Sequence, residues 1–191
     1  RRLNDIAFSG DGEPTTEKRF AEVAKVAAEL LRRRSLTSVQ LVLITDAACL
    51  HHERVIRGLD IMHGANGVIW AKLDAGTQDL YEQVNRTMVP FSRVLANLAA
   101  TARSYRLIVQ SLFFSSHGLP PTTDQIAAYV DRLLEIEAEG TIEEVHVYTV
   151  ARQPAEPWCT PLTDAQVDGI VDAVQARTHA PVRGFYGPAE P

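Results

Sequence analysis

The sequence predicts an α/β fold in which helices cover a parallel β-sheet. Short β-rich runs alternate with segments of helical periodicity along the 191-residue chain. The strand-like runs begin about every 30 residues, the usual size of a βα unit. Such alternation is typical of a parallel sheet, which forms either an open doubly wound sheet or a full or partial (β/α) barrel. Periodicity alone does not distinguish these two architectures.

Six runs rich in β-branched and other apolar residues are the expected strands. They are Asp5–Gly10, Ser38–Thr45, Asn66–Leu73, Tyr105–Phe114, Glu143–Val150 and Pro181–Tyr186. The first lies close to the start of the sequence, although a strand of a parallel sheet normally has a neighbour on each side. We therefore expect at least one βα unit to precede it; an edge strand is the alternative.

The intervening segments carry apolar residues at the three-or-four spacing of a helix with one buried face. The expected helices are Phe20–Leu31, Gln78–Asn85, Val89–Ser104, Ile126–Leu134 and Val167–Val174. Two of them have a capping box in front, Thr122 with Gln125 and Thr163 with Gln166, in which each side chain bonds a free backbone N–H.

Composition excludes several classes of protein. With 46% hydrophobic and 23% charged residues, the chain is neither disordered nor a repeat or disulfide scaffold. A net charge of −5 argues against a dedicated nucleic-acid surface. No apolar run approaches the ~20 residues that cross a bilayer. Cys49 and Cys159 are isolated thiols, which suggests a reducing compartment, and we expect a cytoplasmic protein.

Polar residues collect where the expected strands end. In parallel α/β folds this edge of the sheet binds ligands. The strand-end residues are Ser9–Glu13, Thr45 with Asp46, Lys72 with Asp74, Gln110 with Ser111, and Tyr148 with Thr149.

Lys72 and Asp74 lie on one face of their strand because side chains alternate. We expect this pair to point into a barrel interior near its open rim, while Ile69, Ala71 and Leu73 pack on helices. A buried lysine and aspartate must pair with each other or with a ligand. A purely structural ion pair is the alternative to a role in organising a ligand.

The segment Ser9–Thr16 places two glycines and two acidic residues between a strand and a helix. Backbone N–H groups can approach a ligand closely at such a turn. It is not a phosphate loop, because no Gly-Lys-Ser/Thr follows, and it lacks the third glycine of the dinucleotide fingerprint.

At this segment the chain resembles the radical S-adenosylmethionine (SAM) superfamily. Phe8-Ser9-Gly10-Asp11-Gly12-Glu13-Pro14-Thr15 is similar to the family's Gly-Gly-Glu motif, often extended to Gly-Glu-Pro-Thr, with Asp11 in place of the first glycine. Ala71–Thr77 resembles the family's Lys-Leu-Asp segment, and Val84-Asn85-Arg86 the Asn-Arg that follows it. Val109–Phe113 and Val147–Glu156 resemble later strands of the branch that contains the wyosine-type iron–sulfur oxidoreductases.

The resemblance implies a partial (β/α) TIM-like barrel with parallel strands, its N-terminal βα unit or units missing. Residues 1–191 would then be a single domain, the C-terminal portion of the radical SAM core barrel. The implied SAM-binding residues are Asp11, Gly12, Glu13, Thr45, Asp46, Lys72, Asp74, Gln110 and Tyr148. By the resemblance, Glu13 and the backbone beside it bind the amino group of SAM, and Thr45 and Asp46 face its carboxylate or ribose. Lys72 and Asp74 lie near the cofactor or a cation, and Gln110 and Tyr148 near the ribose or adenine.

The family's Cys-x3-Cys-x2-Cys loop, which binds a [4Fe–4S] cluster, does not occur in this sequence. Its ligands are expected upstream of Asp5, because Cys49 and Cys159 cannot form such a site. In the intact enzyme an electron donor such as flavodoxin or ferredoxin is implied, as is cleavage of SAM to a 5′-deoxyadenosyl radical. The substrate is unknown, and the chain alone is expected to be inactive.

Two other functions remain open. An ordinary (β/α)-barrel lyase or aldolase would use Lys72 as a Schiff-base lysine, which borohydride trapping of a carbonyl substrate would reveal. A non-catalytic module would bind SAM or another ligand without a cluster. The histidines point to neither: His51, His52 and His63 lack zinc spacing, and His117 is expected in a flexible surface loop. His146 is expected to be a satisfied core or barrel residue.

Overall fold

Six parallel strands form one sheet whose spatial order follows the chain. The computed structural model describes residues 3–10 and 12–187. The strands are β1 (Asp5–Phe8), β2 (Gln40–Thr45), β3 (Gly67–Lys72), β4 (Leu107–Leu112), β6 (Ile142–Tyr148) and β8 (Val182–Phe185), in the order β1-β2-β3-β4-β6-β8. A doubly wound sheet reverses its strand order at a switch point. The unreversed order therefore confirms the partial barrel.

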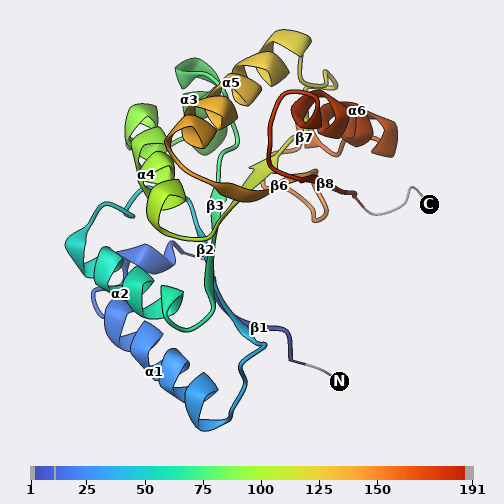
Figure 1. Cartoon of the computed structure of the whole chain (residues 1–191). Helices are drawn as coiled ribbons and strands as arrows, with labels where there is room; N and C mark the ends of the chain where they lie inside the picture. Colours follow the sequence, from blue (N-terminus) through green and yellow to red (C-terminus); the bar gives the residue numbers. More distant parts are fainter. Residues whose placement is uncertain (1–2, 11, 188–191) are drawn as a thin grey trace.

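Helices cover one face of this sheet and leave the other as a concave surface (Figure 1). They are α1 (Phe20–Arg33), α2 (Glu53–His63), α3 (Gln78–Asn85), α4 (Phe91–Ser104), α5 (Thr123–Glu139) and α6 (Asp164–Gln175). A short 3-10 turn, η1 (Pro14–Thr16), joins β1 to α1, and both expected capping boxes are present.

Alternation along each strand sorts the side chains between the two faces. On β2, Leu41 and Leu43 join the main core under the helices, whereas Val42 belongs to a smaller cluster on the concave side. Trp70 of β3 packs on that smaller cluster. The concave face is therefore apolar toward the amino ends of the strands, and polar side chains follow toward the carboxyl ends.

Gly76 allows α5 to approach the loop after β3. A Cβ at this position would lie 2.2 Å from the backbone nitrogen of Tyr129. Such a contact cannot form without displacing the α5 backbone. The glycine thus fixes how α5 closes over the carboxyl ends of β3 and β4.

Most predicted elements are confirmed, with shorter strands than expected. For example, β1 ends at Phe8 rather than Gly10, and β4 ends at Leu112 rather than Phe114. The helix α2 was not among the predicted ranges; its N-cap residue, His52, makes no side-chain cap hydrogen bond that would mark its start. The antiparallel pair β5 (Ser115–Ser116) and β7 (Cys159–Thr160) was also missed, since two-residue strands carry no periodic signal.

Candidate functional site

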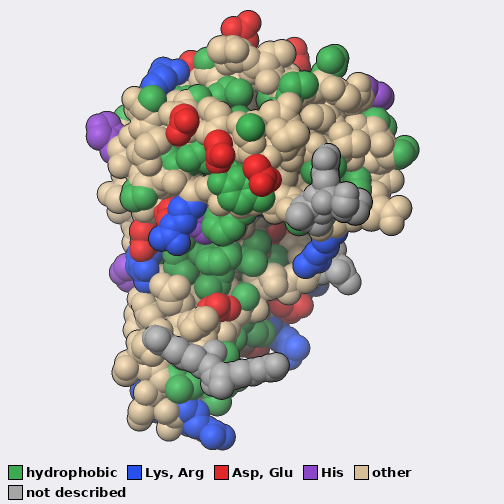
Figure 2. Space-filling view, turned by 90° about the vertical axis from the view of Figure 1, so that its right-hand side faces the viewer, with side chains coloured by type: hydrophobic (Ala, Val, Ile, Leu, Met, Phe, Trp, Pro, Cys, Tyr) green, Lys and Arg blue, Asp and Glu red, His purple; other side chains and the backbone are tan. Residues whose placement is uncertain are grey.

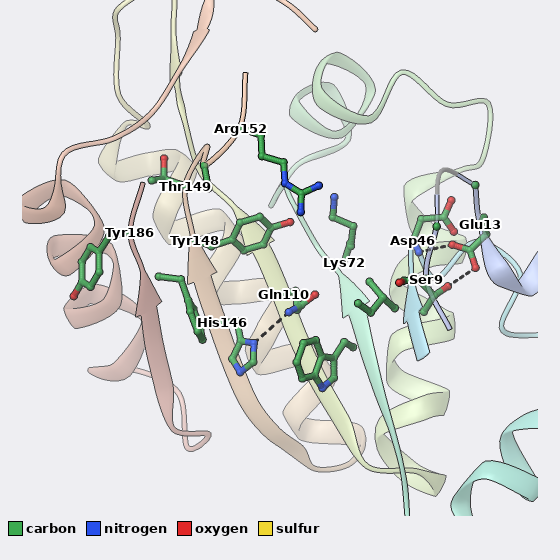
Figure 3. Close-up of a pocket in the computed structure, with 17 residues that line it drawn as sticks. Ser9, Glu13, Asp46, Lys72, Gln110, His146, Tyr148, Thr149, Arg152 and Tyr186 are labelled. Carbon is green, nitrogen blue, oxygen red and sulfur yellow. Dashed lines mark hydrogen bonds between the residues drawn. The ribbon is translucent and has the colours of Figure 1, made fainter. Parts of the chain in front are cut away.

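The carboxyl ends of the strands surround a cavity of about 870 Å³ on the concave face. Figure 2 looks onto this side of the molecule, where hydrophobic side chains gather in its middle. Figure 3 shows acidic residues of the β1 and β2 ends on one side of the cavity and polar residues of β3, β4 and β6 across from them. Cavities of this size bind cofactors and small substrates.

Glu13 fastens the turn after β1 to the end of β2. Its Oε1 accepts hydrogen bonds from the Thr15 backbone N–H at 3.0 Å, from the Thr15 hydroxyl at 2.5 Å and from the Thr45 hydroxyl at 2.7 Å. Its Oε2 accepts from the Asp46 backbone N–H at 2.8 Å. One carboxylate thus positions two strand ends, and Oε2 retains acceptor capacity toward the cavity.

Asp46 adds a second carboxylate at this wall. Partial burial raises its pKa, and the nearby charge of Glu13 raises it further. Its Oδ1 accepts from the Ala48 backbone N–H at 2.8 Å, which partly offsets these effects. Glu13 and Asp46 disfavour each other's ionisation, so this wall of the cavity is suited to a positively charged ligand group.

Lys72 and Asp74 form the predicted ion pair, with Nζ 3.6 Å from Oδ2. The Asp74 side chain is 4% exposed and that of Lys72 37%. Asp74 Oδ1 also accepts from the Leu112 backbone N–H at 2.8 Å. The charge of Asp74 raises the pKa of Lys72 despite the burial of the lysine, so its ammonium is stable at neutral pH.

Tyr148 lies beside this pair at the end of β6. Burial raises the pKa of its phenol to about 12, and the negative charge of Asp74 contributes. The phenol therefore keeps its proton at neutral pH and can donate a hydrogen bond. Arg152 follows on the same wall, and Figure 3 shows its charged end turned toward that of Lys72.

Gln110 occupies the middle of the cavity floor and belongs to a chain of polar contacts. Its Nε2 lies 3.3 Å from His146 Nδ1, and His146 Nε2 lies 2.8 Å from Glu144 Oε2. Glu144 Oε1 in turn pairs with Arg183 of β8. The expectation that His146 is a satisfied barrel residue is confirmed, but its contact with a cavity residue was not foreseen.

The structure brings together most of the predicted site residues. Those that line the cavity are Gly12, Glu13, Thr45, Asp46, Lys72, Gln110 and Tyr148. Asp74 is different: it lies behind Lys72 and lines a separate cavity of about 290 Å³, so it reaches the main cavity through its ion pair. Asp11 lies outside the described residues.

Sequence reasoning placed Arg152 after a strand end without a role, and it did not single out the aromatic cavity residues Trp70, Phe185 and Tyr186. Trp70 and Phe185 had a usable signal, because strand alternation places them on the same faces as Lys72 and Arg183. The indole Nε1 of Trp70 is buried and has no hydrogen-bond partner among the described residues.

His117 is exposed, as expected for a surface loop, but its ring is in contact with a neighbouring segment. Its ring stacks on Trp158, with centroids 5.3 Å apart and planes 10° apart. Its backbone N–H donates to the Trp158 carbonyl at 2.9 Å. The loop is thus joined to the segment after β6, which sequence spacing could not indicate.

The described residues do not supply a cluster site. Within residues 3–10 and 12–187 no group of three His, Cys, Asp or Glu side chains is placed to hold a metal ion. Cys49 and Cys159 are both free thiols. In the same ranges, no helix has the length and apolar character needed to cross a membrane.

Comparison with known proteins identifies the fold. No protein-family model matches the sequence, and no curated protein sequence matches it. Solved structures do match. A domain of pyruvate-formate lyase-activating enzyme from Bacteroides vulgatus superimposes with a TM-score of 0.65 at 11% identity, covering 95% of this chain and 99% of that one.

Two larger enzymes match as well. SuiB from Streptococcus suis, solved with SAM bound, gives a TM-score of 0.67 at 13% identity over 95% of this chain and 39% of SuiB. TYW1, solved with a lysine-pyruvate adduct, gives 0.64 at 12% identity over 92% of this chain and 51% of TYW1. The chain thus spans about half or less of these two proteins. It has the partial-barrel fold of the radical SAM enzymes.

Proposed function

We propose that this chain forms the SAM-binding part of a radical SAM iron–sulfur enzyme and corresponds to the C-terminal portion of its core barrel. The observation that carries the proposal is the cavity at the carboxyl ends of the strands, with an acidic wall and a basic wall. The shared fold and the resemblance of the Gly12–Thr15 turn support the same assignment.

The charges of the two walls complement those of SAM. Glu13 and Asp46 would face its ammonium and sulfonium groups, because carboxylates form strong charge-assisted hydrogen bonds with ammonium donors. Lys72 would face its carboxylate from across the cavity. Gln110 and Tyr148 would contact the adenosine portion, one as an amide and the other as a phenol donor.

The glycines of the turn keep the cavity entrance open. A Cβ built at Gly10 or Gly12 meets nothing within 4 Å, so neither glycine is required by packing. Both line the cavity. Their absence of side chains would instead let backbone groups approach the ligand.

In this superfamily SAM supplies an organic radical when an iron–sulfur cluster is reduced beside it. The described residues do not fit such a cluster. We infer that its cysteine ligands come from a segment upstream of Asp5, and that a flavodoxin- or ferredoxin-type donor supplies the electron. The role of the residues described above is to bind and orient SAM and to exclude water.

A Schiff-base role for Lys72 is disfavoured by its ion pair. A nucleophilic lysine must be a neutral amine, which requires a lowered pKa. Asp74 raises the pKa of Lys72 instead. A binding module without a cluster is the alternative, and the sequence upstream of Asp5 distinguishes it: three closely spaced cysteines there support the enzyme, and their absence supports the module.

Calorimetric titration of the chain with SAM tests the proposal. We expect binding, and we expect Lys72→Met to weaken it roughly tenfold, because a hydrogen bond between charged groups is lost. Lys25→Met is the matched control, since Lys25 lies on α1 outside the cavity.

Thermal unfolding of both variants shows whether removing the partner of Asp74 disturbs the fold. Absence of SAM binding by the natural sequence, or equal affinity of a folded Lys72→Met variant, would contradict the proposed site.

A further inference from the structure

A polar chain that includes two cavity-lining residues, Gln110 and His146, runs across three strands. Arg183 of β8 pairs with Glu144 of β6, Glu144 contacts His146 two residues along the same strand, and His146 contacts Gln110 of β4. The side chains of Glu144 and His146 are 13% and 7% exposed, whereas that of Arg183 is 69% exposed. Only Gln110 at its end belongs to the set of predicted cofactor contacts.

Donor and acceptor chemistry fixes the direction of this chain. A guanidinium can only donate, so Glu144 Oε1 accepts from Arg183. Glu144 Oε2 then accepts from a hydrogen on His146 Nε2. The Gln110 amide nitrogen can only donate, so His146 Nδ1, which faces it, is the acceptor. The Gln110 carboxamide oxygen is left to accept a hydrogen bond from a ligand.

Aromatic neighbours hold the imidazole in this orientation. The Trp70 ring lies edge-on to it, with centroids 5.5 Å apart and planes 76° apart. The Phe185 ring lies 4.8 Å away at 57°. Rotation of the imidazole about its Cβ–Cγ bond would break the contacts with Glu144 and Gln110. The ring is thus held both by packing and by hydrogen bonds.

We propose that His146, Glu144 and Arg183 are positioning residues that fix the Gln110 carboxamide with its oxygen toward the cavity, where it selects ligands with an O–H or N–H donor. This inference rests on the proposed function in one respect: it takes the ligand to be the nucleoside part of SAM. A reversed amide would present N–H groups and repel the same donor. The orientation therefore decides specificity.

A double-mutant cycle with SAM as the probe tests the proposal. We expect His146→Leu and Gln110→Ala each to weaken SAM binding roughly tenfold, as loss of an orienting partner does at comparable sites. If His146 acts through Gln110, the double variant binds no more weakly than Gln110→Ala. His146→Asn retains an acceptor near Nδ1 and should restore most of the affinity.

Two further variants keep the test decisive if His146→Leu fails to fold. Arg183→Met alters an exposed side chain, and its effect should likewise vanish in the Gln110→Ala background. His179→Leu is the control, because His179 is also paired with a glutamate but is 92% exposed and outside the cavity. Additive losses for His146 or Arg183 with Gln110 would overturn the positioning role.

Nitrogen-15 NMR of the imidazoles separates this proposal from the proposed function. We expect the neutral His146 tautomer with hydrogen on Nε2, with or without SAM. A hydrogen on Nδ1 would overturn the positioning role even if SAM binds. The expected tautomer in a chain that does not bind SAM would instead refute the cofactor assignment and leave the orientation of Gln110 supported.

Discussion

The surroundings of Asp46 disfavour the ionised form of its carboxyl group. Its pKa is raised by partial burial and by the neighbouring Glu13 carboxylate. The folded protein therefore binds a proton more tightly at this position than the unfolded chain does. The stability contributed by this proton is fully present below the pKa of Asp46 in the unfolded chain, and it is lost as the pH rises through the higher folded-state pKa. A bound cation would offset this loss of stability, because it favours the ionised carboxylate.

Replacing Asp46 with Asn should separate binding from stability. The amide oxygen of Asp46→Asn can still accept from the Ala48 backbone N–H, while the repulsion with Glu13 is removed. We expect stability at neutral pH to be retained or slightly increased, and its decline with rising pH to become smaller.

SAM affinity should fall roughly tenfold in the same variant, the loss expected for one hydrogen bond to a charged group. Denaturant unfolding at several pH values and calorimetry measure the two effects. A variant that loses stability but keeps its SAM affinity would show that Asp46 is structural.

Individual site residues were predictable where a strand end coincided with a recognisable motif. Glu13 and Lys72 carried both signals, and both line the cavity. The contact of His146 with Gln110 was not predictable, because it depends on strand register between β4 and β6. The pairing of Glu144 with Arg183 depends on the register of a third strand. Neither strand register can be predicted from the local sequence.

At the scale of elements, close approach of α5 to the sheet depends on Gly76. Gly76→Ala would place a Cβ against the backbone of Ala128 and Tyr129. We expect a loss of roughly 1–3 kcal/mol in the free energy of unfolding, as overpacking of a rigid contact usually costs.

Gly169→Ala is the matched control for this prediction. Gly169 lies within α6, and a Cβ there meets nothing within 4 Å. This substitution should stabilise the protein by roughly 0.5–1 kcal/mol, because alanine is the better helix former. Chemical denaturation of both variants measures the difference. Equal effects would mean that the α5 contact is softer than the structure indicates.

Helices with strong end signals were predicted best. Thr122 with Gln125 and Thr163 with Gln166 form the expected capping boxes, and α5 and α6 begin directly after them. The start of α2 has no side-chain cap, and its N-cap residue His52 is not a preferred one. The residues at its start therefore did not predict this helix, which packs mainly against α1.

For the whole molecule, the sequence predicted the parallel α/β class but not its closure. Alternating strands and helices fit both a doubly wound sheet and a barrel. The resemblance at Gly10–Thr15 favoured the barrel, and the strand order confirms it. Because all the helices lie on one face, the other face stays free to form a cavity (Figures 1 and 2).

The central claim is that SAM binds on the concave face, between the acidic and basic walls of one cavity. Chemical-shift mapping of the isotope-labelled chain during SAM titration tests it most directly. We predict that the largest changes occur at Gly12, Glu13, Asp46, Lys72 and Gln110, from four different strand ends. Changes confined to the helix-covered face, or none at saturating SAM, would contradict the account.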